Sequence, residues 1–265
     1  MIGGPHTIDE RTYRHDSGLN YSLLKNIQDS PSKAKWRQMN PKEPTAAMKL
    51  GTMMHYAVLE PDKFLDLYTV APTVNKRTKA GRDELAEIES SGKTPLAKDV
   101  YDDAITLAHR VNSGHIGRYI KNAEFETSWF ADHDFGVRVK GRLDAWLPEK
   151  NIIVDLKTCQ SASPWEFGKQ VRERRYDAQA AFYCDLVAKI TGQQVSGYLW
   201  LAVETTEDKD VAAYLCDEAL LQKGRRDYER WMRTWIACDQ TGCWPGYPDE
   251  LNILSAPDWF LNKLD

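Results

Sequence analysis

Residues 141–158 read GRLDAWLPEKNIIVDLKT, which is two apolar segments joined by the turn-like residues Pro-Glu-Lys-Asn. The second segment, residues 152–157, opens with three β-branched residues in succession, which is typical of a buried strand. Side chains along a strand alternate between its two faces, so Asp155 and Lys157 share one face of this strand. A carboxylate and an ammonium on such a strand need a partner or a metal ion.

The segment before the turn, predicted as a strand at residues 136–147, also alternates apolar and charged side chains. If the four turn residues form the loop, the antiparallel register places Asp144 opposite Asp155 and Arg142 opposite Lys157. The Cβ atoms of the two aspartates would then lie roughly 4.5–5.5 Å apart. Two like charges in that position destabilise a sheet, whereas a divalent cation between them removes the repulsion.

The rest of the chain predicts one domain with three consecutive parts. Residues 1–120 are mainly helical, residues 121–217 hold the candidate catalytic sheet and a helix, and residues 218–265 form a C-terminal helix and tail. Periodicity and turn signals predict helices at 21–28, from 31 onward, and at 46–60, 79–90, 97–112, 176–191 and 218–238, with strands at 67–71, 123–131, 136–147, 152–157, 195–204 and 211–216. We therefore expect an α/β fold: a mixed central sheet flanked by helices, with an N-terminal helical subdomain.

Composition is consistent with a protein of the cytoplasm. The mean hydropathy is −0.57, and no apolar run approaches the roughly 20 residues that a membrane span needs. The first residues lack the charged and apolar regions of a signal peptide. The chain has five cysteines, an odd number at scattered positions, which suits a reducing compartment.

The net charge of −4 excludes a uniformly basic surface, so any contact with nucleic acid must use local basic patches. Lys76 and Arg77 follow a predicted strand, and Arg172, Arg174 and Arg175 directly precede the helix predicted at 176–191. Arg142 on the strand predicted at 136–147 is a further candidate for DNA contact, and other basic clusters lie near residues 33–42 and 225–233. For each cluster the alternative interpretation is a solvated helix face.

Several motifs give these residues a family resemblance. Asp144 followed by Asp155-x-Lys157 resembles the PD-(D/E)xK nuclease superfamily, whose fold is restriction-endonuclease-like. Gly51-x-x-x-His55 and Gln179-x-x-x-Tyr183 resemble the upstream and downstream helix motifs of RecB-like nucleases, in the same order along the chain. The stretches HYAVLEP from His55, VAP from Val70, KRT from Lys76 and GKT from Gly92 are similar to the nuclease domain of the RecE family, exodeoxyribonuclease VIII.

The resemblance implies a metal centre. His55, Asp144, Asp155 and the Leu156 carbonyl would hold Mg²⁺, for which Mn²⁺ can substitute, and Glu126 is a further candidate ligand. The resemblance also implies roles for site residues that do not bind the metal. Lys157 would orient the attacking water, and Gln179 and Tyr183 would support that water or the scissile phosphate.

Each of these roles has a simpler alternative. His55 shares a helix face with apolar residues and could be a core histidine, and Glu126 could be a solvated strand residue. Gln179 and Tyr183, four residues apart, could be one face of an amphipathic helix that packs under the sheet.

Ser22 and Lys25 are candidates for gripping a DNA 5′-phosphate, a role that an early serine and arginine have in related phage exonucleases. A serine at a helix N-terminus can bind an anion, but it can equally be an ordinary N-cap. No arginine stands beside Ser22, so Lys25 would have to supply the charge.

The function implied by the resemblance is a Mg²⁺-dependent double-stranded DNA exonuclease with 5′→3′ polarity, acting in homologous recombination by single-strand annealing. The resemblance also implies a ring of three or four subunits around a DNA end, and a single-strand annealing partner of the RecT type. Some RecB-type relatives hold an iron–sulfur cluster with one cysteine before the nuclease core. Here the first cysteine is Cys159, already past that core, so we expect no cluster.

Two alternatives remain open from the sequence. One is a RecB-like DNA-repair endonuclease, which would cut closed circular DNA. The other is a non-catalytic DNA-binding module that retains the fold and would bind no divalent metal.

Overall fold

The computed structural model describes residues 1–41, 43–72 and 78–256. Within them the main sheet has six strands in the order β1-β4-β5-β6-β7-β8. Only β6 and β7 pair in parallel, so the sheet is mixed, as expected. The strands are β1 (Gly3–His6), β4 (Glu124–Asp132), β5 (Arg138–Leu147), β6 (Ile152–Cys159), β7 (Gly197–Glu204) and β8 (Val211–Leu215). A second, two-stranded parallel sheet pairs β2 (Tyr68–Val70) with β3 (Thr94–Leu96).

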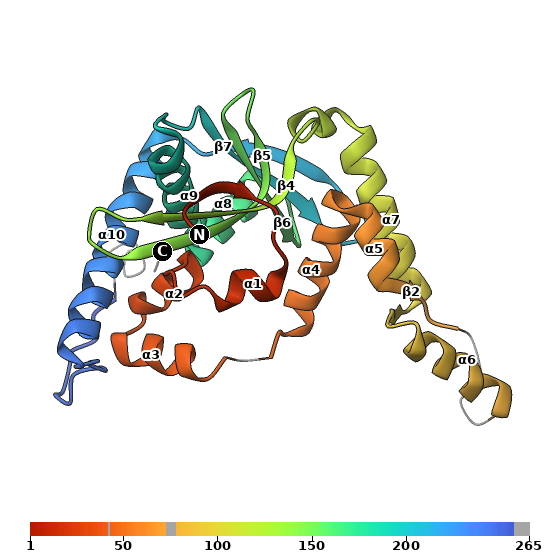
Figure 1. The fold of residues 1–265 in the computed structure, drawn as a ribbon, viewed down its shortest axis with the longest axis horizontal. Helices are drawn as coiled ribbons and strands as arrows, with labels where there is room; N and C mark the ends of the chain where they lie inside the picture. The colour runs from red at the N-terminus through yellow and green to blue at the C-terminus, as the bar shows by residue number, and fades with distance from the viewer. Residues whose placement is uncertain (42, 73–77, 257–265) are drawn as a thin grey trace, which may run out of the picture.

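Helices cover both faces of the main sheet, as Figure 1 shows. On one face lie α9 (Tyr176–Thr191) and α10 (Glu218–Thr241), and on the other lie α4 (Ala46–Leu59) and α7 (Lys98–Ser113). The remaining helices are α1 (Glu10–His15), α2 (Tyr21–Lys25), α3 (Pro31–Met39), α5 (Pro61–Leu67), α6 (Lys79–Ser90) and α8 (Pro164–Arg174), with short 3₁₀ turns at Asn26–Gln28 and His115–Tyr119. The predicted fold class is confirmed.

The two faces bury separate hydrophobic cores. The α9 and α10 core contains Ile153, whereas the α4 and α7 core contains Val154 and Leu156. Because side chains alternate along β6, Asp155 and Lys157 leave the sheet on the same face as Ile153, toward α9.

The predicted register of β5 and β6 holds where the two strands pair. Ala145 pairs with Val154, Trp146 with Ile153 and Leu147 with Ile152. Within these two described strands the ladder stops there, one pair short of Asp144 and Asp155, so the predicted pair of Arg142 with Lys157 does not form.

The strands separate because Asp144 is itself a hydrogen-bonding partner of β6. The Leu156 N–H donates to Asp144 Oδ2 at 2.8 Å, so a side-chain carboxylate replaces a backbone carbonyl across the ladder. We call the opening between β5 and β6 beyond Ala145 and Val154 the fork.

The pairing between β4 and β5 is also interrupted, at Glu126 and Asp144. Its register skips both residues, and Glu126 has a left-handed φ of 50°. On β5 the alternation changes here as well, because Leu143 packs in the α9 core and Ala145 in the α4 core. A left-handed φ such as that of Glu126 is uncommon for a residue other than glycine, and it is found mostly at turns and functional sites.

The N-terminal segment pairs with β5 through Leu19, which lies beside Val139, and buried charge also ties the two together. Lys140, 4% exposed, donates to the carbonyls of Tyr13 at 2.7 Å and Asp16 at 2.5 Å. Arg138 pairs with the Asp16 carboxylate at 2.7 Å. This segment holds β1 and α1, neither of which the sequence pattern predicted.

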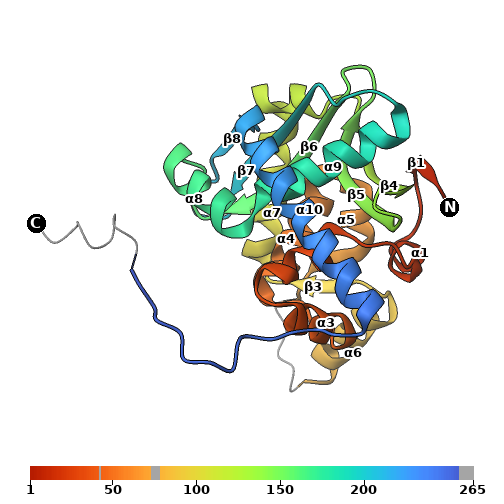
Figure 2. The ribbon, with the colours of Figure 1, turned by 90° about the vertical axis from the view of Figure 1, so that its left-hand side faces the viewer.

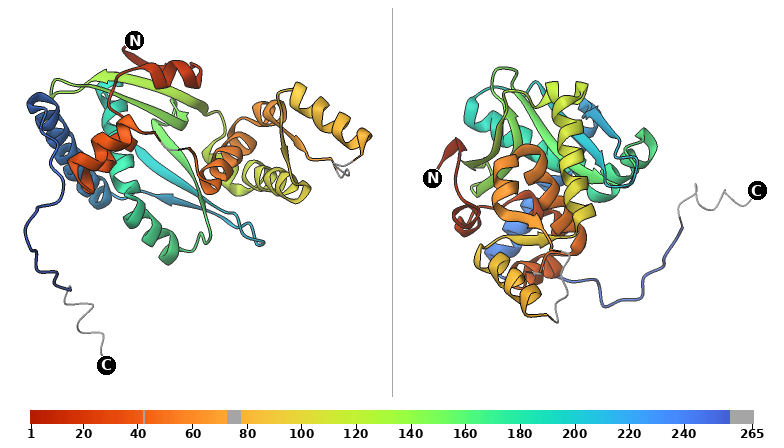
Figure 3. Two further views of the ribbon diagram at one scale, coloured as in Figure 1. Left: turned by 90° about the horizontal axis from the view of Figure 1, so that it is seen from below. Right: turned by 90° about the vertical axis from the view of Figure 1, so that its right-hand side faces the viewer.

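Two parts extend from the compact body. The α6 helix with β2 and β3 projects to one side in Figures 1 and 3, and the chain after α10 leads away from the body in Figure 2. In the described part of the chain no helix combines the length and the apolar character that a bilayer crossing requires.

Candidate active site

The fork exposes one backbone unit of β6 to side chains from two elements, β5 and α4. In a strand the N–H and C=O of one residue point the same way, so both polar groups of Leu156 face the opening left by β5. The N–H is taken by Asp144, and the carbonyl lies 3.0 Å from His55 Nε2. The site is therefore built around Leu156.

His55 comes from α4, which Thr45 caps and which ends before Pro61. Gly51, one turn earlier, faces β6, and a Cβ atom there would lie 3.6 Å from Thr158 Oγ1, an ordinary contact distance. A carbonyl can only accept a hydrogen bond, so Nε2 of His55 must carry the hydrogen. The Nδ1 atom then faces the carboxylates, 3.6 Å from Asp144 Oδ2 and 3.9 Å from Glu126 Oε1.

His55, Glu126 and Asp144 form a group that could hold a metal ion. One ligand atom from each residue lies within 4.8 Å of the other two. The left-handed backbone of Glu126 and the opened ladder at Asp144 bring both carboxylates to the fork. Asp155 is not one of this group, and the Leu156 carbonyl, a predicted ligand, lies 3.0 Å from His55 Nε2.

The electrostatics of this group follow from burial. Desolvation raises the pKa of Asp144 above its usual value. Burial alone would lower the pKa of His55, but Asp144 and Glu126 outweigh it and raise that pKa to about 9. Without metal, a shared proton on His55 balances part of the negative charge, and a metal ion must replace that proton.

Asp155 and Lys157 form a pair on the α9 side of β6. Lys157 Nζ lies 2.5 Å from Asp155 Oδ2, and Asp155 is 1% exposed. Neither oxygen of Asp155 has a hydrogen-bond partner in the described structure, so the contact with Lys157 is an ion pair whose angles do not suit a hydrogen bond. Desolvation raises the pKa of Asp155 to about 6.

Lys157 keeps its proton despite burial. Desolvation alone would lower its pKa, but Asp155 and Asp144 raise it above the usual value. Its ammonium also lies 4.8 Å from the centroid of the Tyr176 ring, and the Tyr176 hydroxyl accepts from Gln170 Nε2 at 3.2 Å. Sequence reasoning missed Tyr176 and Gln170. Helical spacing could have found Tyr176, which stands three residues before Gln179.

Gln179 and Tyr183 lie on α9, on the side that faces β5. The Tyr183 ring packs against Gly141, where a Cβ atom would meet it at 3.0 Å. Burial raises the pKa of Tyr183 well above its usual value, so the phenol stays neutral and can only act through hydrogen bonds. The structure places Tyr183 against β5, and the roles of Gln179 and Tyr183 stay predictions.

The predicted DNA-contact residues differ in how the structure places them. Ser22 is exposed but does not cap α2, because Asn20 does; Lys25 donates to the Arg174 carbonyl at 2.6 Å. Arg172 and Arg174 are exposed. Lys76 and Arg77 lie outside the described residues.

Arg142 and Arg175 are engaged within the chain. Arg142 pairs with Glu10 at 2.6 Å, and Arg175 bridges Asp177 at 2.9 Å and Asp227 at 2.5 Å. These guanidinium groups anchor the N-terminal segment and the corner between α8 and α9, respectively. We expect them to position the site rather than to contact DNA.

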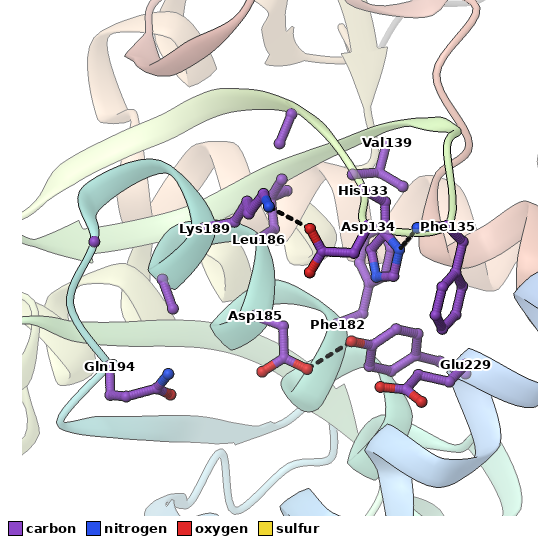
Figure 4. Close-up of a pocket in the computed structure, with 14 residues that line it drawn as sticks. His133, Asp134, Phe135, Val139, Phe182, Asp185, Leu186, Lys189, Gln194 and Glu229 are labelled. Carbon is purple, nitrogen blue, oxygen red and sulfur yellow. Dashed lines mark hydrogen bonds and ion pairs between the residues drawn. The ribbon is translucent and has the colours of Figure 1, made fainter.

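A cavity of about 370 Å³ lies elsewhere, between the β4–β5 turn, α9 and α10 (Figure 4). Its carboxylates already have partners: Asp134 pairs with Lys189, and Asp185 accepts from the Tyr228 hydroxyl at 2.5 Å. It contains none of the residues around the fork, so the fork is the candidate active site.

Comparisons with known proteins place the chain among nuclease-like folds. A family model described as a PDDEXK-like domain of unknown function, DUF3799, matches residues 20–257. Among curated proteins no match was found. A solved structure of a putative exonuclease from Eubacterium rectale aligns at 16% identity with a TM-score of 0.67, covering 98% of each chain.

Two further solved structures align less well. A phage-related exonuclease from Haemophilus somnus shows 14% identity and a TM-score of 0.39, covering 88% of this chain and 100% of its own. An alkaline exonuclease from Laribacter hongkongensis shows 12% identity and a TM-score of 0.30, covering 71% and 89%. Neither score carries an argument, so of these three structures it is the Eubacterium one that supports the shared fold.

Proposed function

Because the chain belongs to the PDDEXK-like family DUF3799, we propose that it is a divalent-metal-dependent nuclease that degrades double-stranded DNA from its ends. The observation that carries this proposal is the arrangement on either side of Leu156. The possible metal ligands His55, Glu126 and Asp144 gather at the fork, and the Asp155–Lys157 pair stands next to them along β6.

The residues fit a divalent ion. The fork offers two carboxylates and an imidazole, and the neighbouring Asp155 has two buried oxygens without hydrogen-bond partners. Oxygen ligands suit Mg²⁺, and an added imidazole nitrogen suits Mn²⁺ better. When bound, the ion would supply positive charge to the scissile phosphate and lower the pKa of a bound water.

The other groups of the site would handle the water and the developing charge. Lys157, which keeps its proton, would orient the attacking water and stabilise negative charge on the phosphate. Asp155 holds that ammonium in place, and the Tyr176 ring covers it from the α9 side. Gln179 and Tyr183 would position the phosphate by hydrogen bonds.

The finer parts of the proposal rest on the RecE-like motifs of the sequence. They are 5′→3′ polarity, Mg²⁺ as the working metal, a ring of three or four subunits, action with a RecT-type annealing protein in recombination, and a cytoplasmic location. A ring supports sustained digestion by a protein of net charge −4, because basic residues need only line its channel.

One experiment separates the possible functions. Linear and closed circular duplexes are incubated with and without Mg²⁺, with the label on either the 5′ or the 3′ end of the linear DNA. We expect loss of linear DNA only, dependent on metal, with mononucleotides released first from the 5′ label.

The controls define the alternatives. Cleavage of the circle would favour an endonuclease, and absence of both cleavage and metal binding would favour a DNA-binding module. Lys157→Ala should be inactive, whereas Lys189→Ala, which removes a surface ion pair at the distant cavity, should keep full activity.

A further inference from the structure

The exposed face of α8 carries an aromatic residue and two cations in one stripe. Trp165 is 75% exposed, although tryptophan is normally among the more buried residue types. Lys169 and Arg172 are also exposed, and they follow Trp165 by four and seven residues. Helical geometry therefore stacks the three side chains on one face, along about 10 Å of helix.

The helix that carries this stripe is linked to Lys157 through Tyr176 and Gln170. The Tyr176 ring covers the Lys157 ammonium, and its hydroxyl accepts from Gln170 Nε2. Gln170 belongs to α8 and also donates to the Thr158 carbonyl at 3.2 Å. The helix is thus fixed to the strand end that carries the site, and in Figure 2 it forms the left edge of the body.

The charges of the helix decide what kind of ligand fits. Glu166, Glu173 and Arg174 are also exposed on this helix, so α8 carries a net charge of only +1 and offers little long-range attraction for a duplex backbone. Affinity must come mainly from the tryptophan ring. A ring can stack on a base only if that base is unpaired and unstacked.

We infer that the Trp165–Lys169–Arg172 face of α8 binds single-stranded DNA beside the active site. Trp165 stacks on a base, and the two cations contact the phosphates on either side of it. The inference rests on the proposed function, because digestion of one strand from a duplex end leaves the other strand unpaired next to the site. This face would hold the unpaired strand away from Lys157.

The test is binding of a fluorescein-labelled strand of about 12 thymidines, within the 4–16 nucleotides that single-strand sites cover, measured by anisotropy in EDTA. Trp165→Ala should weaken binding about tenfold or more, and Trp165→Phe should retain most of the affinity. Lys169→Ala and Arg172→Ala should each lower the slope of log K against log salt by about 0.7. Binding to a blunt duplex should not change in Trp165→Ala.

The matched control is Trp36→Ala, because Trp36 is 54% exposed on α3 and stands between Lys35 and Arg37. It should bind the thymidine strand as the wild type does. Equal affinity of Trp165→Ala and wild type, or an equal loss in both tryptophan variants, would overturn the inference. EDTA keeps the test independent of hydrolysis, so an inactive enzyme with Trp165-dependent binding would defeat only the proposed function.

Discussion

Asp155→Asn should stabilise the metal-free protein at neutral pH while it abolishes hydrolysis. Burial raises the pKa of this carboxyl from its usual 3.8 to about 6, even with Lys157 at 2.5 Å. The folded state therefore holds the Asp155 proton more tightly than the unfolded state does. The stabilisation that comes from the protonated Asp155 carboxyl is fully present below pH 3.8 and is lost as pH rises through 6.

The magnitude follows from the difference between the two pKa values. At pH 7.5 ionised Asp155 costs the wild type about 3 kcal/mol, which an uncharged asparagine avoids. This figure is an upper limit, because the new amide must find hydrogen bonds and Lys157 loses a partner. The gain should be roughly half as large at pH 5 and should approach zero below pH 4.

The assay is thermal unfolding in EDTA, followed by circular dichroism across this pH range. A gain of about 3 kcal/mol corresponds to roughly 5–10 °C in Tm for a chain of this length. Asp16→Asn is the matched control, because its hydrogen bonds to Arg138 hold the pKa of Asp16 below the usual value. That variant should lose stability at pH 7.5. A destabilised Asp155→Asn, or a gain that does not vary with pH, would refute the reasoning.

Four further predictions concern the site and the assembly. Lys157→Ala should abolish hydrolysis with the circular dichroism spectrum unchanged, and wild-type turnover in a folded variant would remove Lys157 from the mechanism. His55→Ala should lose activity in Mg²⁺ and regain part of it in excess Mn²⁺; a lower Tm without metal rescue would mean a structural histidine. Gly224→Ala should cost more than ~3 kcal/mol in urea unfolding, because its Cβ would lie 2.2 Å from the Asp177 carbonyl oxygen, whereas Gly168→Ala should be tolerated. Light scattering should give three or four times the 30.3 kDa of one chain, and a monomer that digests processively would contradict the ring.

The strand register could be predicted because both strands around the Pro-Glu-Lys-Asn turn alternate cleanly between apolar and charged residues. The loop length then leaves one way to pair Leu147 with Ile152. The helix at Tyr176–Thr191 was predicted with its observed bounds, since its apolar period is long and Gly192 follows it.

The fork itself could not be predicted from alternation. Alternation assumes continuous pairing, whereas the Asp144 carboxylate replaces a backbone acceptor and Glu126 adopts a left-handed φ of 50°. Neither event leaves a residue pattern in a single sequence. The same holds for β1, which is four residues long and pairs only with one edge of the sheet.

The hydrogen bond from Leu156 N–H to Asp144 makes one amide a natural reporter of the site. A cation that draws the Asp144 carboxylate toward itself must compete with this amide for the same oxygens. The Leu156 nitrogen and proton resonances should therefore move on metal titration, well before any turnover is measured. Because this bond is also the contact that joins β5 to β6 beyond the last backbone pair, a residue that cannot accept it would alter both ligand geometry and the fork. Position 144 thus serves architecture and chemistry together.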